Sequence, residues 1–214
     1  MTAQISDIFK YQNEDYSVVA VSKVIPFKPE NFGLEPQMSS TACWRGYWCE
    51  YNIINDKFLL NKLYFHNMEG NYPPFNGVKI SPQEFVDSVV YNLNDKKSRI
   101  EKSPAHSGHR LYKNVNLLIP YTGKIMLGKG FLNEYCIHMG FQRGWAYEKL
   151  IELSFENGKL VDYKDLSHKA KEQREILENH RNEKDNNSEK SLKEIFESVN
   201  KSFSLDYSDK VWWK

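Results

Sequence analysis

The sequence predicts an α+β fold that is mainly an antiparallel β-sheet, arranged as a sandwich or an open barrel, with one inserted helix and two C-terminal helices. Two observations carry this prediction. Runs of β-branched and aromatic residues are separated by turn residues, as at Asn55-Asp56 and Asn157-Gly158, and after Asp165 the chain changes to polar, helix-forming residues. We therefore expect residues 1–166 to form a β-rich core domain and residues 167–214 to form a helical appendix that packs on the core or on a partner.

Composition limits the classes of protein to which the chain can belong. The 214 residues are 40% hydrophobic and 14% aromatic, which is enough apolar material for one core. Lys and Arg number 29 against 28 Asp and Glu, so the net charge of +1 gives no broad field toward nucleic acid or an anionic membrane. The sequence shows no secretion signal and no membrane-length apolar run, and its three cysteines suit a reducing compartment. We expect a cytoplasmic protein without a cofactor.

The N-terminal half begins with two predicted hairpins. Residues 5–25 are rich in β-branched residues and contain the turn-forming Asn13-Glu14-Asp15, whereas the prolines of residues 26–40 indicate a loop. Thr41–Ile54 and Lys57–His66 are long β-type runs joined by a two-residue turn. Both faces of this second hairpin carry bulky side chains, so we expect it to be central and covered on both sides.

A helix is predicted next, after a loop over residues 67–77. Ser81-Pro82-Gln83-Glu84 has the order of a capping box with proline at the first helical position, so the helix should run from about Pro82 to Asn92. Its apolar residues recur at three- and four-residue spacing and should form a buried stripe. They are Phe85, Val86, Val89, Val90 and Leu93. The polar, basic segment Asn94–Arg110 has no period and is expected to be an exposed loop.

Strand patterns return in the second half of the core. The Asn157-Gly158 turn between the last two runs is the strongest hairpin signal in the chain, and it favours an antiparallel sheet. The predicted strands are Leu111–Pro120, Gly123–Leu127, Tyr135–Gln142, Trp145–Phe155 and Lys159–Tyr163.

The appendix divides into two unlike helices. Ser167–Lys184 has a narrow apolar stripe and an otherwise solvated surface. Leu192–Phe203 instead has a regular apolar face that must be covered, and so must Trp212 and Trp213 near the C-terminus. We therefore expect a protein partner, or self-association, at the C-terminal helices.

Residues 42–50 are the most distinctive segment in composition. They hold Trp44, Arg45 and Trp48 beside two cysteines. One interpretation is an aromatic platform on which Arg45 binds an anion or a carboxylate. The other, which we favour, is a core strand whose arginine pairs with a buried acid or stacks on a ring.

Two histidines and several basic residues share the segment 96–113. His106 and His109 could hold a metal together with a carboxylate, but a pair of solvent-exposed histidines is the simpler interpretation. The basic residues could contact phosphates, although a solvated loop is favoured because the whole chain is nearly neutral. They are Lys96, Lys97, Arg99, Lys102, Arg110 and Lys113, offset by Asp95 and Glu101.

The cysteines suggest no reactive centre. Cys43 and Cys49 lie too far apart on an extended strand to share a metal, which argues against structural zinc. Cys136 and His138 are two residues apart on a predicted strand. The distance between two such residues is too long for the hydrogen bond of a catalytic dyad, so a structural histidine is favoured. The common hydrolase, nucleotide-binding and cofactor motifs are missing.

Three stretches carry a resemblance to other proteins: TACWRGYWCEYNIINDKFLLNKLYF, YCIHMGF and YEKLIELSFENGKLV. They resemble the body of small bacterial immunity-like proteins encountered near polymorphic-toxin and other intercellular-conflict loci. The resemblance covers roughly residues 41–66 and 121–163. It implies a partner-binding role without catalysis, and the C-terminal helices lie outside it.

These observations leave three functions open. The leading prediction is a non-catalytic, cytoplasmic protein-binding module of the immunity or antitoxin kind, because catalytic signatures are missing and the C-terminus is apolar. One alternative is a metal-dependent hydrolase or nuclease that uses His106 and His109. The other is nucleic-acid binding through the basic segment 96–113, with an affinity that falls steeply with salt.

Overall fold

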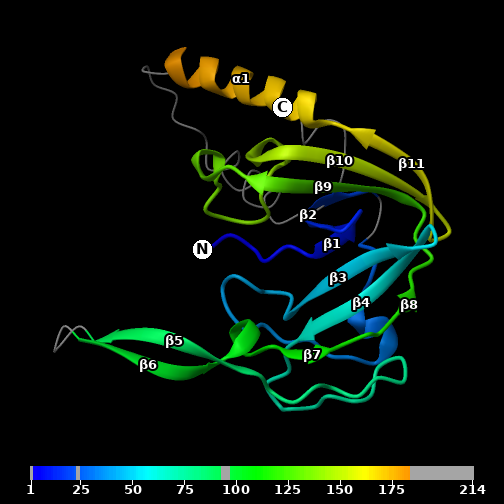
Figure 1. The fold of residues 1–214 in the computed structure, drawn as a ribbon, viewed down its shortest axis with the longest axis vertical. Helices are drawn as coiled ribbons and strands as arrows, with labels where there is room; N and C mark the ends of the chain where they lie inside the picture. The colour runs from blue at the N-terminus through cyan, green and yellow to red at the C-terminus, as the bar shows by residue number, and fades with distance from the viewer. Residues whose placement is uncertain (1, 23–24, 93–96, 184–214) are drawn as a thin grey trace, which may run out of the picture.

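The computed structural model describes residues 2–22, 25–92 and 97–183. Nine of the described strands form one sheet, and seven of them close into a barrel (Figure 1). In spatial order the strands are β11 (Lys159–Asp165), β10 (Tyr147–Glu156), β9 (Gly123–Phe131), β2 (Glu14–Val21), β1 (Ile8–Tyr11), β3 (Tyr47–Ile54) and β4 (Lys57–Phe65). Pairing of Lys159 with Lys57 joins β11 to β4 and completes the ring, in which only β1 and β3 run parallel. The mainly antiparallel α+β fold is confirmed, with a closed rather than an open barrel.

Tight turns made by residues in the left-handed conformation join the predicted hairpins. Asn55 (φ 51°) and Asp56 (φ 61°) connect β3 to β4, as expected of a two-residue turn. Gly158 (φ 76°) closes the β10–β11 turn, where an added Cβ would lie 2.4 Å from the carbonyl oxygen of Ile119. Its own carbonyl accepts a hydrogen bond from the amide of Phe58 in β4 (2.8 Å). Only glycine fits at this position, where β11 approaches β4.

Aromatic rings fill the barrel. Phe9 from β1, Phe58 from β4 and Phe155 from β10 are each at most 2% exposed. The ring of Phe58 lies 5.4 Å from that of Phe9 and 4.8 Å from that of Phe155, measured between centroids. Rings from different sides of the barrel thus meet at its centre and form a packed core.

One α-helix covers part of the outside of the barrel. Helix α1 (Ser167–Glu183) lies along β10, with Ala170 fully buried against Leu150 in a second apolar cluster (Figure 1). Arg174 of this helix donates hydrogen bonds to the backbone oxygens of Trp145 and Tyr147, both at 2.9 Å, which link the helix to the barrel. The first C-terminal helix is confirmed. In the part of the chain that is described, no helix is long and apolar enough to cross a membrane.

The inserted helix predicted over Pro82–Asn92 is wrong. This segment contains strand β5 (Phe85–Asn92), which pairs with β6 (Lys97–Pro104) and, within the described ranges, with no other strand. The two strands project from the barrel as a hairpin, which we call the arm (Figure 1). Its valines are β-branched and favour extended backbone, and pairing with β6 satisfies the backbone groups that a helix would have satisfied internally.

The exposed loop predicted over Asn94–Arg110 is also wrong, because the described part of this segment contains residues that pair with β5 and β4. Its described part forms β6, a short 3-10 helix (Ala105–Gly108) and the start of β7 (Arg110–Tyr112). The strand predicted over Leu111–Pro120 is also interrupted. It divides into β7 and β8 (Leu117–Leu118), both paired with β4, because Asn114 and Asn116 take left-handed conformations between them.

Two further expectations differ from the structure. Residues 135–142 do not form a strand, because the side-chain amide of Gln142 bonds both backbone groups of Ile137 (2.8 and 3.0 Å) and closes a local loop instead. The segment 41–46 is a set of turns, and the strand begins only at Tyr47. The predicted helix Leu192–Phe203, with Trp212 and Trp213, lies outside the described residues.

Candidate functional site

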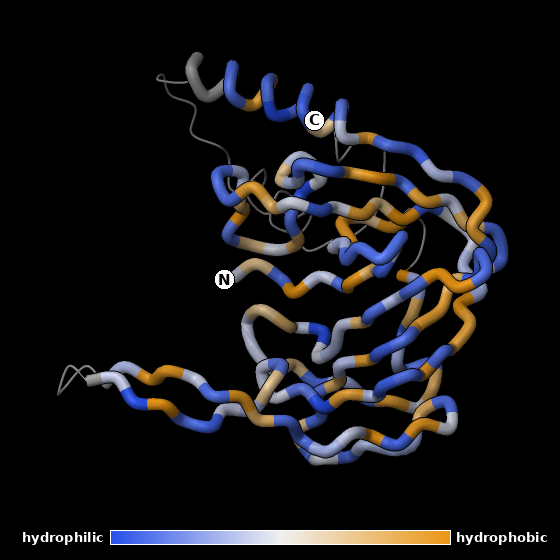
Figure 2. The backbone as a smooth tube through the Cα atoms, viewed as in Figure 1, coloured by the Kyte–Doolittle hydropathy of each residue, from blue (hydrophilic) through white to orange (hydrophobic). Residues whose placement is uncertain are grey.

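The arm has one face that is strongly apolar and exposed. Directly paired residues of an antiparallel hairpin lie on the same face, so four large apolar residues share one side of the arm. They are Phe85 (57% exposed), Val89 (73%), Tyr91 (56%) and Ile100 (73%), which we call the apolar face. A single ion pair between Lys102 and Asp87 (2.5 Å) crosses the two strands on this face. Figure 2 shows apolar positions on both strands of the arm.

The opposite side of the arm, which we call the polar face, is held together by polar contacts. The hydroxyls of Ser88 and Ser103 lie 2.6 Å apart across the strands. Arg99 Nε lies 2.6 Å from Glu101 Oε1. Val86 shares this face and is 50% exposed. The two faces therefore differ in chemistry more than in exposure.

An isolated two-stranded hairpin is marginally stable in water, and it gains stability when a further strand or another surface covers it. Large apolar side chains clustered on a projecting element also mark surfaces that bind other molecules, whereas single exposed apolar residues are ordinary. The arm combines both features. It is the best candidate for a binding surface among the described residues.

A stack of aromatic and imidazole rings supports the base of the arm, on the outside of the barrel. Trp48 of β3 and Tyr64 of β4 are cross-strand neighbours whose rings are parallel, 4.6 Å apart between centroids. His109 contacts the Trp48 ring edge-on at 4.3 Å and His66 at 5.6 Å. His106 contacts the Tyr64 ring at 4.9 Å. The ring stack therefore joins the last residues before β7 to β3 and β4.

His109 is buried, with 1% of its surface exposed, and both of its ring nitrogens have partners. Nδ1 lies 2.9 Å from the backbone oxygen of His106, and because a carbonyl only accepts, Nδ1 must carry the proton. Nε2 is then the acceptor for the hydroxyl of Ser39 at 3.1 Å. Burial lowers the pKa of His109 to about 4, so the ring is neutral at neutral pH.

This arrangement does not bring His106 and His109 together as metal ligands. Binding a metal through His109 would require it to lose one of its two hydrogen bonds. His106 Nε2 instead lies 3.6 Å from Glu84 Oε2, and the chain adopts left-handed conformations at His106 (φ 54°) and Ser107 (φ 55°). The described residues contain no cluster of three or more His, Cys, Asp or Glu side chains placed to hold a metal.

Several of the basic residues near the arm have partners within the described part of the chain. Lys113 pairs with Glu84 at 2.5 Å, and this contact lowers the pKa of the Glu84 carboxyl. Arg110 donates two hydrogen bonds to the backbone oxygen of Ser81 (3.1 and 2.8 Å) and lies over the ring of Tyr72. With the pairs of Arg99 and Lys102 described above, four of the basic residues noted in the sequence have acidic or backbone partners, and nucleic-acid binding stays a prediction.

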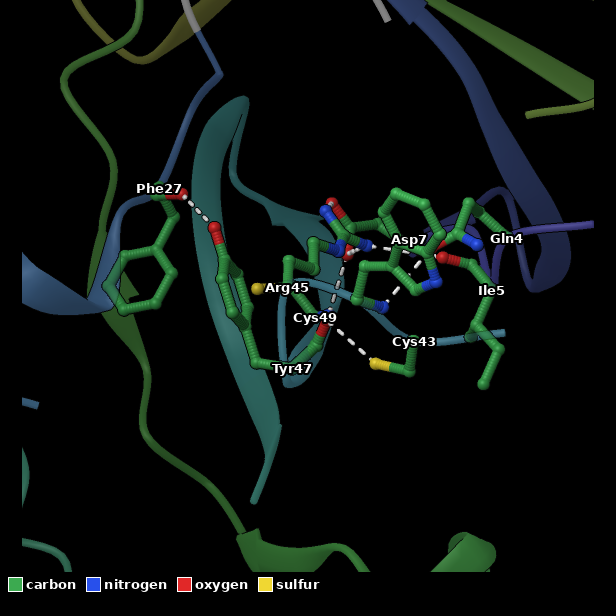
Figure 3. Close-up of polar contacts among 9 residues, drawn as sticks. Gln4, Ile5, Asp7, Phe27, Cys43, Arg45, Tyr47 and Cys49 are labelled. Atoms are coloured by element: carbon green, nitrogen blue, oxygen red, sulfur yellow. Dashed lines mark hydrogen bonds and ion pairs between the residues drawn. The ribbon is translucent and has the colours of Figure 1, made fainter. Parts of the chain in front are cut away.

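Arg45 makes the structural contacts that the sequence favoured. Its Nη2 lies 2.6 Å from Asp7 Oδ1 and its Nη1 3.3 Å from Asp7 Oδ2, which makes a two-point ion pair (Figure 3). Asp7 Oδ1 also accepts the amide proton of Cys49 (2.8 Å), and Asp7 is 2% exposed. The guanidinium carbon lies 5.0 Å from the centre of the Tyr47 ring and 5.7 Å from that of Phe141. Although burial disfavours a charge, Asp7 raises the pKa of Arg45 above its ordinary value.

The two tryptophans of residues 42–50 are separated by their environments. Trp44 is 46% exposed and its backbone amide donates to Gln4 Oε1 (3.2 Å), whereas Trp48 is 7% exposed within the ring stack. They do not form the shared platform considered from the sequence. Burial raises the pKa of the Cys43 and Cys49 thiols, which makes them poor nucleophiles.

Sequence reasoning missed the residues that matter most at the arm. Phe85 and Val89 were assigned to the apolar stripe of a predicted helix, and Tyr91 and Ile100 were not singled out. An alternation of Phe85, Val89 and Tyr91 with an interrupting Asp87 was the available signal, and it competed with an equally good helical spacing. The sequence gives no indication of the role of Asp7, because nothing in the short segment before β1 shows that a distant arginine will contact it.

Comparison with known proteins gives no relative from which a role could be transferred. No protein-family model, no curated protein and no solved structure matches this chain.

Proposed function

We propose that this chain is a non-catalytic protein-binding module with an immunity-like or antitoxin-like role, and that its partner protein binds the apolar face of the arm. The observation that carries the proposal is the exposure of four large apolar side chains on one face of a projecting hairpin. Phe85 and Tyr91 supply aromatic rings, which are enriched among the residues that dominate binding energy at protein interfaces.

The size of the apolar face sets the kind of complex to expect. Covering each of these partly exposed side chains contributes about 1–2 kcal/mol, or about 4–8 kcal/mol for the face, before the cost of association. That sum alone supports a weak complex. A partner that binds tightly must therefore also contact the backbone edges of the arm, or the base where the ring stack lies.

The experiment uses the product of the gene adjacent to the one that encodes this chain. Co-expression tests whether the chain relieves toxicity of that product, and titration of the purified proteins gives the dissociation constant. We expect the double variant Phe85→Ser/Val89→Ser to bind at least about tenfold more weakly, a loss of about 1.4 kcal/mol or more. Val86→Ser, on the polar face, is the matched control and should change affinity less than about threefold.

Two results would reject the proposal. In the first, no neighbouring product binds the unaltered chain or is neutralised by it. In the second, a neighbouring product binds but the apolar-face variant and the Val86→Ser control have the same affinity, which would place the interface elsewhere. Thermal melting of each variant confirms that the barrel is folded before its affinity is compared.

A further inference from the structure

The outer edge of β6 has backbone hydrogen-bonding groups that no described strand pairs with. The amide of Ala105 donates to the carbonyl of Glu84 (2.8 Å) just beyond the strands, so this pair is a hydrogen-bonded one. Hydrogen-bonded and non-hydrogen-bonded pairs alternate along an antiparallel hairpin, and residues of the second kind point their N–H and C=O groups away from the partner strand. Along β6 the outward-pointing residues are Ser98, Ile100 and Lys102. Within the described ranges no strand covers this edge.

The side chains along this edge are complementary to themselves. Arg99 and Glu101 lie on either side of Ile100, with their side chains on the polar face. In an antiparallel pairing centred on Ile100, Arg99 of each copy stands opposite Glu101 of the other copy. Ile100 faces its own counterpart on the apolar face. Opposite charges at directly opposed positions stabilise a strand pair, and like charges destabilise it.

We infer that a second copy of this chain pairs with the edge of β6, so that two arms form one four-stranded sheet in the order β5-β6-β6-β5. The two-fold axis passes through the sheet at Ile100, which makes the contact closed and symmetric. The outward N–H and C=O groups of both copies then make up to about six interchain hydrogen bonds. This association does not depend on the proposed function, since it requires no other protein.

The edge of β5 offers no comparable match. By the same alternation, Phe85, Asp87, Val89 and Tyr91 point their backbone groups outward from β5. A symmetric pairing centred on Val89 places Asp87 opposite Tyr91 and Ser88 opposite Val90, so no opposite charges meet. The charge pattern therefore selects the edge of β6 and fixes the register of the contact.

Pairing at this edge also changes the binding surface. The two apolar faces become neighbours on one side of the four-stranded sheet, with the two Ile100 side chains at its centre. A sheet of four strands is more stable on its own than a hairpin of two. The proposed contact consists of two short strand edges, so the interface is small, and the expected dissociation constant is on the order of micromolar or weaker.

Sedimentation analysis of the full chain over a range of concentrations tests the inference. We expect a reversible dimer that Ile100→Pro weakens at least about tenfold. The N–H of residue 100 points outward, so proline there removes interchain hydrogen bonds without breaking the β5–β6 ladder. Val89→Pro is the matched control, because it places the same ring at the directly paired, outward position of β5 and should leave the dimer in place.

Charge variants test the register. Arg99→Glu and Glu101→Arg each place like charges opposite one another across the axis, so each alone should dimerise more weakly than the unaltered chain. A mixture of these two variants should restore association as a heterodimer, because every opposed pair is then of opposite charge. The double variant Arg99→Glu/Glu101→Arg should restore the homodimer.

Three outcomes would overturn the inference. The unaltered chain could remain monomeric at concentrations up to about 1 mM, the two proline variants could weaken the dimer equally, or the charge-variant mixture could fail to associate. Dimerisation with an intact register but no binding of a neighbouring gene product would instead reject only the proposed function. Thermal melting confirms that each variant is folded.

Discussion

Arg45 and Asp7 form an ion pair in which each charge compensates the other away from solvent. The Arg45 side chain is 18% exposed and that of Asp7 is 2% exposed, so neither charge could be left without the other at low cost. Asp7 also accepts the amide proton of Cys49, which ties the segment before β1 to the start of β3. Breaking a buried pair by removing one member is strongly destabilising, because an uncompensated charge remains inside the protein.

Replacing Asp7 should therefore cost more than the loss of an ordinary ion pair. We expect Asp7→Ala to lower the free energy of unfolding by about 3–5 kcal/mol, measured by urea denaturation at neutral pH. The control is Asp15→Ala, because the Asp15 side chain is 67% exposed and lies 3.9 Å from Lys10. That variant should change stability by less than about 0.5 kcal/mol. Equal losses in the two variants would contradict this account of the buried pair.

His109 should make stability depend on pH in a defined window. Burial lowers its pKa from 6.5 to about 4, so the unfolded chain takes up a proton at this histidine at higher pH than the folded chain does. Stability is therefore complete above the unfolded pKa and is lost as the pH falls from about 6.5 toward 4. We expect about 2 kcal/mol less stability at pH 5 than at pH 7 from this residue alone.

Denaturation curves at pH 7 and pH 5 check this expectation. His109→Gln should remove most of the difference between the two pH values, since the amide does not titrate. His138→Gln, at an exposed position, is the matched control for the substitution itself. A difference between the two pH values that persists in full in His109→Gln would contradict this assignment.

At the scale of single residues, the local sequence predicted the kind of contact that a side chain makes but not the residue with which it makes it. The aromatic and arginine content of residues 42–50 correctly indicated a structural arginine with an acid and a ring nearby. It could not identify Asp7, because that contact depends on the parallel pairing of β1 with β3. His109 was expected in solvent, but it is buried because β7 adds to the edge of β4 and carries it into the ring stack.

At the scale of elements, turns were more informative than periodicity. The hairpins around Asn55-Asp56 and Asn157-Gly158 are confirmed, because a two-residue turn constrains its flanking strands locally. The arm shows the opposite case. The apolar residues of β5 fit a helical spacing as well as a strand with one interruption, and the choice is made by pairing with β6, whose sequence is mostly polar. Whether this segment forms a helix or a strand therefore cannot be predicted from the sequence of either strand alone.

At the scale of the whole molecule, no local sequence pattern predicts that the barrel closes or that the arm projects from it. The barrel closes where Lys159 of β11 meets Lys57 of β4, about a hundred residues away in sequence. The arm leaves this closed body without adding to either of the large apolar clusters. The molecule thus separates a stable scaffold from a projecting element, as is common where binding surfaces are carried by a rigid fold.

This separation predicts that the arm is dispensable for folding and required for association. Replacing residues 87–102 by Asn-Gly leaves Val86 paired with Ser103, and the alternation of the hairpin makes this a hydrogen-bonded pair of the kind that a two-residue turn closes. We expect the free energy of unfolding, measured by urea denaturation of dilute monomer, to change by less than about 1 kcal/mol. Self-association by sedimentation and affinity for a partner should both fall to background. A loss of more than about 3 kcal/mol would instead show that the arm supports the barrel, through the ring stack at its base.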